Sequence, residues 1–341
     1  MLPSFHLTCF GYPQLSKNDQ LVSLETRKAL GLLAYLAASS QFSGESRKPK
    51  HTNGRFSPHL SRTELADLFW PELNTADSKR ALRRALFVLR RDTAPQLWLA
   101  DRERIGLDVD SKLLACDLWA FADCIKGAAG HPEDCTCVDC CHCLETAVSL
   151  HHAPFLHSFD PAASEAFETW QSVVAQQLQD RLIAGLQRLI AGYRHRNHLA
   201  QAIAAAQLWL QLDPLAEKGH RALMALYGHE GNLTAVRRHY AELVTLLQEK
   251  VRANPEAETV ACYHAILTKP GQPWQLTLVQ EARLHGMQMM LRSLLRAKFG
   301  DLPPEVILGV EGLQDEEVAI AVAKEVLTAA SHHHLTFPNR T

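Results

Sequence analysis

Apolar and polar positions alternate at the start of the chain. Residues 5–24 alternate in this way around Gly11-Tyr12-Pro13 and an Asn18-Asp19 turn, which predicts short, half-buried strands of a small sheet. Residues 26–38 then place leucine and alanine at helical spacing, which predicts an amphipathic helix. Residues 40–59 are polar, basic and rich in Ser and Gly, so we expect a loop there.

Two further helices and a hairpin follow. Ser61 and Glu64 form the pattern of a capping box at the start of a helix that ends at Trp70-Pro71. Residues 75–91 predict a longer helix with an apolar core face. Its opposite face carries five basic side chains: Lys79, Arg80, Arg83, Arg84 and Arg90. Residues 97–107 give two strand-like pieces around the charged turn at 101–104.

A sheet, three helices and a hairpin in this order are typical of a winged helix-turn-helix domain. In such domains the last helix enters the major groove and the wing contacts backbone phosphates. Arginine binds guanine in a bidentate way or neutralises phosphates. We therefore expect seven DNA-binding residues: Lys79, Arg80, Arg83, Arg84, Arg90, Arg102 and Arg104. The alternative is a basic helix face that is merely solvated.

Residues 162–267 show one helical pattern after another, broken near Asn197, at Asp213-Pro214 and at Gly231-Asn232. Segments 199–211, 215–229 and 233–250 each have the length of one helix of a tetratricopeptide hairpin. We expect a repeat domain that binds proteins. Four residues at its centre could suggest an acid–base cluster, but helix capping and packing are the preferred interpretation: Asp213, Glu217, His220 and Arg221.

Length and composition indicate a soluble protein of several domains. The chain has 341 residues, 47% of them hydrophobic and 21% charged, and a domain usually takes about 150 residues. It has no apolar run long enough to cross a membrane and no signal-peptide pattern, so we expect a cytoplasmic, reducing environment. The net charge of -2 is unevenly spread: residues 1–115 hold 17 Lys and Arg against 12 Asp and Glu, so this segment is +5 and the remainder is -7. The basic excess lies where a polyanion would bind.

Five of the nine cysteines lie between Cys135 and Cys143. Disulfides are rare in a reducing compartment, so this crowding indicates a local thiol site. The two-residue gap between Cys137 and Cys140 allows two thiolates to bind one tetrahedral Zn²⁺, and His131 lies nearby. Two interpretations stay open, a structural zinc site and a set of thiols that bind no metal.

Several segments resemble a known family. LSRTELADLFWPE and ADSKRALRRALFVLRR resemble the OmpR-type winged helix of regulators that carry a bacterial transcriptional activator domain, including the Streptomyces antibiotic regulatory proteins. FETW at 167–170 and LDPLAEKGHRALMALYGHEGN at 212–232 resemble the activator domain itself. The resemblance implies a tetratricopeptide-like fold, self-association or contact with RNA polymerase, and a recognition helix that carries Lys79, Arg80, Arg83 and Arg84.

The same resemblance implies a preferred metal site, because longer members of the family carry a similar histidine and Cys-x-x-Cys before a helix expected near Leu144. The preferred ligands are Cys124, His131, Cys137 and Cys140. Residues 280–330 resemble the small helical tail of Rpn-type transposase-associated nucleases, without the nuclease core.

The sequence thus predicts a mainly α fold with a small β component: an N-terminal winged helix-turn-helix followed by a tetratricopeptide-like helical repeat domain. Four segments are expected: a DNA-binding domain at 1–115, a Cys/His-rich linker at 116–160, a helical domain at 161–270 and a small tail at 271–341. We expect a regulator that binds double-stranded DNA, contacts RNA polymerase or forms a homodimer, and does not associate with membranes. A protein-interaction scaffold is the alternative. An enzyme is disfavoured because the phosphate-loop, nucleophile-elbow and zincin motifs are missing.

Overall fold

A computed structural model describes residues 4–42, 60–131, 137–268 and, further on, 290–292, 294–299, 306–307, 310, 320–324 and 326. The chain forms two compact units, Met1–His195 and Arg196–Thr341. Within the described ranges, no helix is both long enough and apolar enough to span a bilayer. Most of the basic 40–59 segment lies outside these ranges.

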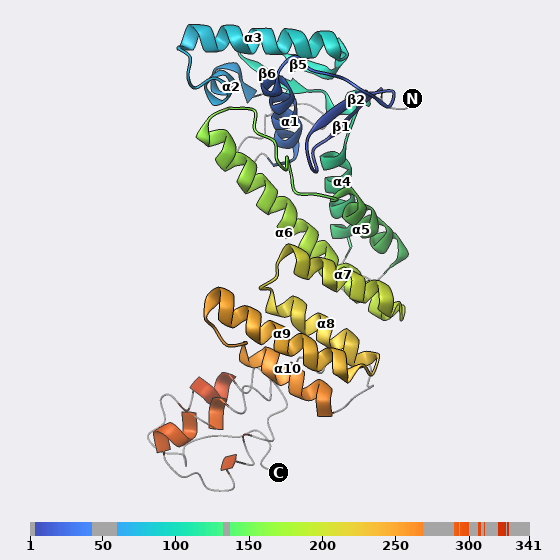
Figure 1. Cartoon of the computed structure of the whole chain (residues 1–341), viewed down its shortest axis with the longest axis vertical. Coiled ribbons are helices and arrows are strands. Elements are labelled where there is room, and N and C mark those ends of the chain that lie inside the picture. The colour runs from blue at the N-terminus through green and yellow to red at the C-terminus, as the bar shows by residue number, and fades with distance from the viewer. Residues whose placement is uncertain are drawn as a thin grey trace. The chain divides into compact units, whose positions relative to one another are not determined.

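The first unit opens with the predicted small sheet (Figure 1). Its strands are β1 (Phe5–Thr8), β2 (Gln14–Lys17), β3 (Gln20–Leu21) and β7 (Leu114–Cys116), in the spatial order β3-β2-β1-β7. β1 pairs antiparallel with β2 and parallel with β7. Phe5 and Leu7 are buried while His6 and Thr8 are exposed, as the alternating pattern predicts for a strand with one solvated face.

Three helices follow: α1 (Arg27–Phe42), α2 (Arg62–Phe69) and α3 (Thr75–Asp92). Ser61 caps α2 as predicted, since its hydroxyl accepts a hydrogen bond from the Glu64 backbone N–H. Asn74 caps α3, where its side-chain oxygen accepts bonds from the N–H groups of Ala76 and Asp77. These caps fix where the two helices begin, and α2 and α1 both pack against α3.

The predicted hairpin consists of β5 (Trp98–Ala100) and β6 (Arg104–Leu107), and β6 also pairs with β4 (Leu60–Ser61). Short 3-10 turns flank the hairpin at Pro95–Leu97 and Val109–Ser111. The order of sheet, three helices and hairpin confirms the predicted winged helix-turn-helix.

Residues 116–160, expected as a linker, contain two packed helices, α4 (Asp117–Ala129) and α5 (Val138–Leu150). The Asp117 carboxylate accepts bonds of 2.7 and 2.9 Å from the Cys9 and Phe10 backbone N–H groups at the end of β1. The buried Trp119 donates its indole N–H to the Ala37 carbonyl in α1. α4 is thus anchored on the winged helix. The domain limits drawn from the sequence remain predictions.

An aromatic cluster joins the start of α6 (Glu165–His195) to the winged helix. Phe167 is fully buried, with its ring centroid 5.1 Å from that of Phe69 in α2. The Trp170 ring lies 4.4 Å from Tyr35 in α1. The FETW segment therefore completes the hydrophobic core beneath α1 and α2.

The second unit contains α7 (Leu199–Leu212), α8 (Glu217–His229), α9 (Leu233–Val251) and α10 (Ala257–Thr268). α8 packs against the other three, and the three predicted repeat helices are confirmed. A Cβ atom on Gly228 would lie 2.5 Å from Ile266 Cγ2, so glycine permits the close approach of α8 and α10.

The suspected acid–base cluster has a structural role in this unit. Arg221 binds Glu256 at 2.7 Å and Glu258 at 3.2 Å, and Glu217 accepts bonds from the Glu256 backbone N–H. His220 hydrogen-bonds His239 and the Pro214 carbonyl. The Arg221 and Glu217 contacts fix the connection before α10 against α8, and the His220 contacts join α8 to α9 and to the turn before α8, as capping and packing predict.

The described residues of the C-terminal segment are helical. Leu291, Leu295, Val306 and Val310 are buried. The Pro303-Pro304 break lies outside the described residues, and the resemblance of this segment to a nuclease tail stays a prediction.

Candidate functional site

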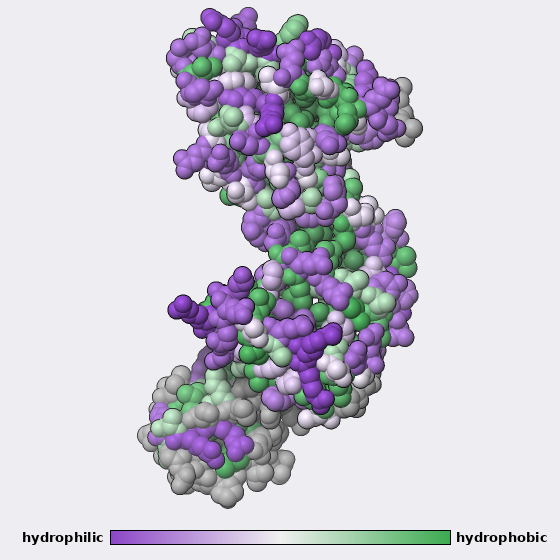
Figure 2. Space-filling model, in the orientation of Figure 1, coloured by the Kyte–Doolittle hydropathy of each residue, from purple (hydrophilic) through white to green (hydrophobic). Residues whose placement is uncertain are grey.

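One face of α3 is basic and exposed. Lys79, Arg80, Arg83 and Arg84 are all exposed, as the sequence predicts. The opposite face buries Leu82, Ala85, Leu86, Val88 and Leu89. The apolar face holds the helix in place, so the basic side chains project together into solvent. Hydrophilic residues cover much of the surface over α3 (Figure 2).

Intramolecular partners leave this basic face available. Arg80 Nη1 lies 3.2 Å from Asp77 Oδ1, in a pair whose arginine side chain is 78% exposed. Arg83 Nε donates to the Lys79 carbonyl at 3.2 Å. Within the described part of the chain, neither Arg83 nor Arg84 forms an ion pair. The exposed Arg80–Asp77 pair contributes only about 0–1 kcal/mol to stability, so a DNA phosphate or base could displace Asp77 from Arg80.

Phe87 is an exposed aromatic residue on this face that the sequence analysis did not single out. Its side chain is 68% exposed, one helical turn beyond Arg83 and Arg84. A large apolar side chain among cations is poorly placed for solvent, and apolar side chains in the major groove contact thymine methyl groups. The sequence could have revealed this residue, because Phe87 lies four residues after Arg83, on the same helix face and outside the apolar stripe.

Arg90 differs from the other predicted residues of α3. It is half-buried, and its Nε has no hydrogen-bond acceptor among the described residues. Arg62, at the start of α2, also has a buried Nε without an acceptor there. Burial and the nearby Arg90 lower the pKa of Arg62. Arg62 was missed because it lies inside the capping motif of α2.

The predicted wing is short, and its turn holds two acidic and two basic residues. Asp101 Oδ1 accepts bonds of 2.7 Å from the Glu103 and Arg104 backbone N–H groups, which tightens the turn between β5 and β6. Arg102 and Arg104 are exposed there. Both predicted wing residues can therefore reach a ligand from solvent.

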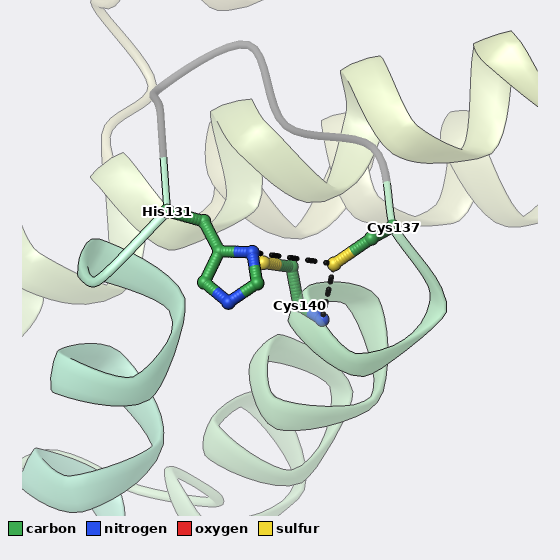
Figure 3. Close-up of side chains that lie close together, drawn as sticks. All are labelled: His131, Cys137 and Cys140. Atoms are coloured by element: carbon green, nitrogen blue, oxygen red, sulfur yellow. Dashed lines mark hydrogen bonds between the residues drawn. The ribbon is translucent and has the colours of Figure 1, made fainter.

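Three of the four predicted metal ligands lie together between α4 and α5 (Figure 3). His131 follows α4, Cys137 caps α5 and Cys140 lies in its first turn. Their ligand atoms all lie within 4.8 Å of one another, and Cys137 Sγ is 3.7 Å from His131 Nδ1. α5 begins at Val138, earlier than the expected start near Leu144, so the Cys-x-x-Cys spans a helix N-terminus.

The fourth predicted ligand, Cys124, is not part of this group. It lies on α4, where burial and the neighbouring Cys143 raise the pKa of its thiol. Cys124 was included among the predicted ligands on resemblance alone. Its spacing from the other cysteines does not determine on which face of α4 it lies.

A second group of metal-type side chains has another explanation. Cys9, Cys116 and Asp117 lie together, and the Asp117 carboxylate already accepts three backbone N–H bonds, from Cys9, Phe10 and Leu118. Burial raises the pKa of the Cys9 thiol well above its usual value. A protonated thiol and an occupied carboxylate are suited to packing, not to binding a cation.

Comparisons with known proteins agree with this architecture. Residues 116–267 match the family model of the bacterial transcriptional activator domain. A solved structure of Mycobacterium tuberculosis EmbR in complex with a low-affinity phosphopeptide is similar, with a TM-score of 0.60 and 16% identity. The match covers 87% of this chain and 72% of that chain, and at this identity it shows a shared fold. No curated protein matches.

The family match includes α4 and α5, which the sequence analysis had set apart as a linker. The described helices α4 to α10 therefore span the matched region. Residues 116–267 of this chain thus match the bacterial transcriptional activator domain, and they follow an N-terminal winged helix-turn-helix.

Proposed function

We propose that α3 reads the major groove of double-stranded DNA through Arg83, Arg84 and Phe87, while Lys79 and Arg80 contact phosphates near its N-terminus. The supporting observation is the exposed basic face of α3, whose two central arginines form no ion pair within the described ranges. Bidentate arginine contacts discriminate guanine from other bases by about 1–3 kcal/mol each.

The wing adds contacts to the DNA backbone. Arg102 and Arg104 lie at the β5–β6 turn, and backbone contacts fix the register of the recognition helix in the groove. Arg90 is half-buried next to Arg62, so we expect it to position α3 more than to contact DNA directly. The expected ligand is a duplex of defined sequence, with α3 supplying most of the discrimination.

The helical domain supplies protein contacts in this proposal. Winged helices commonly bind as dimers on two half-sites, and paired helices of the tetratricopeptide type bind other proteins. We expect self-association on tandem sites and contact with RNA polymerase that activates transcription. The number of chains bound per selected duplex, measured by sedimentation, tests the first expectation. Co-purification with RNA polymerase tests the second.

The decisive experiment selects bound duplexes from a random pool and measures the affinity for the winning sequence. The variant Arg83→Ala/Arg84→Ala should lower that affinity at least about 30-fold, because two bidentate contacts of about 1–3 kcal/mol each are lost. The matched control is Arg237→Ala/Arg238→Ala, an adjacent exposed arginine pair on α9 with the same change in charge.

Equal affinities for the parent and the α3 variant would refute the proposed interface. Failure of the selection to enrich any sequence would favour the alternative, a protein-interaction scaffold. An equal loss in the α9 control would show a general effect of charge, in place of specific contacts by α3.

A further inference from the structure

We propose that His131, Cys137 and Cys140 bind one zinc ion that ties the end of α4 to the start of α5. One imidazole nitrogen and two cysteine sulfurs form a donor set that Zn²⁺ prefers in structural sites. The three side chains converge from two helix ends (Figure 3). The site lies apart from the DNA-binding face, so it is independent of the proposed function.

The distances fit a tetrahedral ion. Zinc–sulfur and zinc–nitrogen bonds of about 2.3 and 2.0 Å at a tetrahedral angle separate the two ligand atoms by about 3.5 Å. Cys137 Sγ and His131 Nδ1 are 3.7 Å apart. The remaining separations stay within 4.8 Å, which small rotations of the side chains can close. The arrangement thus needs little reorganisation to take up an ion.

The helix N-terminus favours the thiolate form that binds metals. Cys137 is the N-cap of α5, and the Cys140 backbone N–H points at its sulfur from 3.4 Å. The positive end of the helix dipole stabilises negative charge at this position. Two thiolates here would repel each other, and a divalent cation between them removes that repulsion.

Burial shapes access to the site. Cys140 is buried, Cys137 is half-buried and His131 is exposed, so one side is closed by protein and the other opens to solvent. Among the described residues, no fourth Cys, His, Asp or Glu joins the group. Water or a further side chain would complete the tetrahedron around the ion.

Zinc at this place would stabilise the helices that carry the activator domain. An ion bound to His131 and Cys137 would link the end of α4 to the start of α5. The two helices already pack against each other. Metal binding by a site that exists only in the folded chain adds its free energy to folding. We therefore expect chelation to lower the melting temperature of the full chain.

The test measures zinc in the full-length protein purified under reducing conditions, by elemental analysis and by competition with a chromophoric chelator. Cobalt substitution supplies a thiolate-to-metal absorption band as a second readout. One ion per chain is expected, with loss of at least 100-fold in affinity for Cys137→Ser/Cys140→Ser. Cys143→Ser, on the same helix but outside the group, is the matched control and should keep the ion.

Three results would overturn the proposal: no stoichiometric metal, a Cys137–Cys140 disulfide formed in place of metal binding, or full retention of zinc by the double variant. Loss of zinc in Cys124→Ser would overturn the three-residue set. Should the double variant not fold, His131→Ala replaces it, because His131 is exposed and its truncation removes one ligand without disturbing the core. Unchanged zinc affinity in that variant contradicts the proposal equally.

Discussion

Two histidines of the second unit form a pair that is sensitive to protonation. His220 Nε2 lies 2.9 Å from the Pro214 carbonyl, which can only accept, so this nitrogen carries the hydrogen. His220 Nδ1 then accepts from His239 Nε2, also at 2.9 Å. Burial lowers the pKa of both rings, and burial, His220 and Arg238 bring the pKa of His239 to about 4. The folded protein therefore favours the state in which both histidines are neutral.

This pair predicts a loss of stability in mild acid. A histidine whose folded pKa lies below its unfolded value of about 6.5 stabilises the fold fully above that pH, and the stabilisation falls as pH drops toward 4. Between pH 7.5 and 5 we expect a loss of about 1–2 kcal/mol, reduced by solvent screening because His239 is only half-buried.

Urea unfolding of the parent and of His239→Gln at both pH values measures this loss. Glutamine keeps an N–H donor for His220 and cannot titrate in this range, so the variant should lose less stability on acidification. Nearby charges that act on the pair, such as Glu242 at 3.7 Å from His239, are the same in both proteins. Replacing the exposed His264 with glutamine supplies the control, and identical pH slopes in all three proteins would contradict the prediction.

At this same scale, pattern in the sequence predicted the exposed cations of α3 but not the environment of each one. Lys79, Arg83 and Arg84 lie outside the apolar stripe, so helical periodicity alone exposes them. Arg90 lies at the edge of the stripe, where its burial depends on α2 and on Arg62, which no local pattern reveals. Phe87 shows the reverse case, an apolar residue on the polar face.

Helix α6 approaches α5 through a glycine. A Cβ atom on Gly192 would lie 2.5 Å from Cys141 Sγ, and Cys141 is buried with Leu144 and Leu189. Alanine gains about 1 kcal/mol of helix propensity, but overpacking a core costs about 1–3 kcal/mol. We expect Gly192→Ala to lower the free energy of unfolding by up to about 2 kcal/mol, as measured by chemical denaturation.

Gly127 provides the matched control in α4. A Cβ atom there would lie 3.6 Å from Cys143 Sγ, which is an ordinary contact, and the residue is exposed. Gly127→Ala should therefore be neutral or stabilising by up to about 1 kcal/mol. Adding Cys141→Ala to Gly192→Ala should relieve part of the cost, because the clashing sulfur is removed. Equal effects of the two glycine substitutions would disprove the steric explanation.

The periodicity of apolar residues predicted which segments form helices or strands, but it did not predict how these elements pack. Leu118, Phe121 and Ala122 have helical spacing, yet the dense cysteines beyond them favoured a linker. What makes α4 part of a core is non-local: Asp117 binds the end of β1 and Trp119 binds α1. Such contacts join residues more than 80 positions apart, and sequence spacing carries no information about them.

Across the whole molecule, the arrangement of charge decides whether a chain with net charge -2 can bind a polyanion. The first 115 residues carry an excess of +5, and the structure exposes six of the seven predicted DNA-binding residues on two elements, α3 and the wing. Each neutralised phosphate releases counterions, so log K should fall with log salt at a slope of about -0.9 per contact. Four of them are proposed to contact phosphates, Lys79, Arg80, Arg102 and Arg104, so the expected slope is about -3.6.

This slope can be separated into contributions from the two elements. Lys79→Ala on α3 and Arg102→Ala on the wing should each reduce its magnitude by about 1, and the double variant by about 2, because the residues lie on different elements. Fluorescence anisotropy of the selected duplex over a salt series measures all four proteins, with Arg237→Ala/Arg238→Ala as the control that leaves the slope unchanged. A slope that responds equally to the α9 control would mean that DNA senses the net charge of the protein. A slope that responds to α3 but not to the wing would remove the β5–β6 turn from the interface while leaving the recognition helix in the groove.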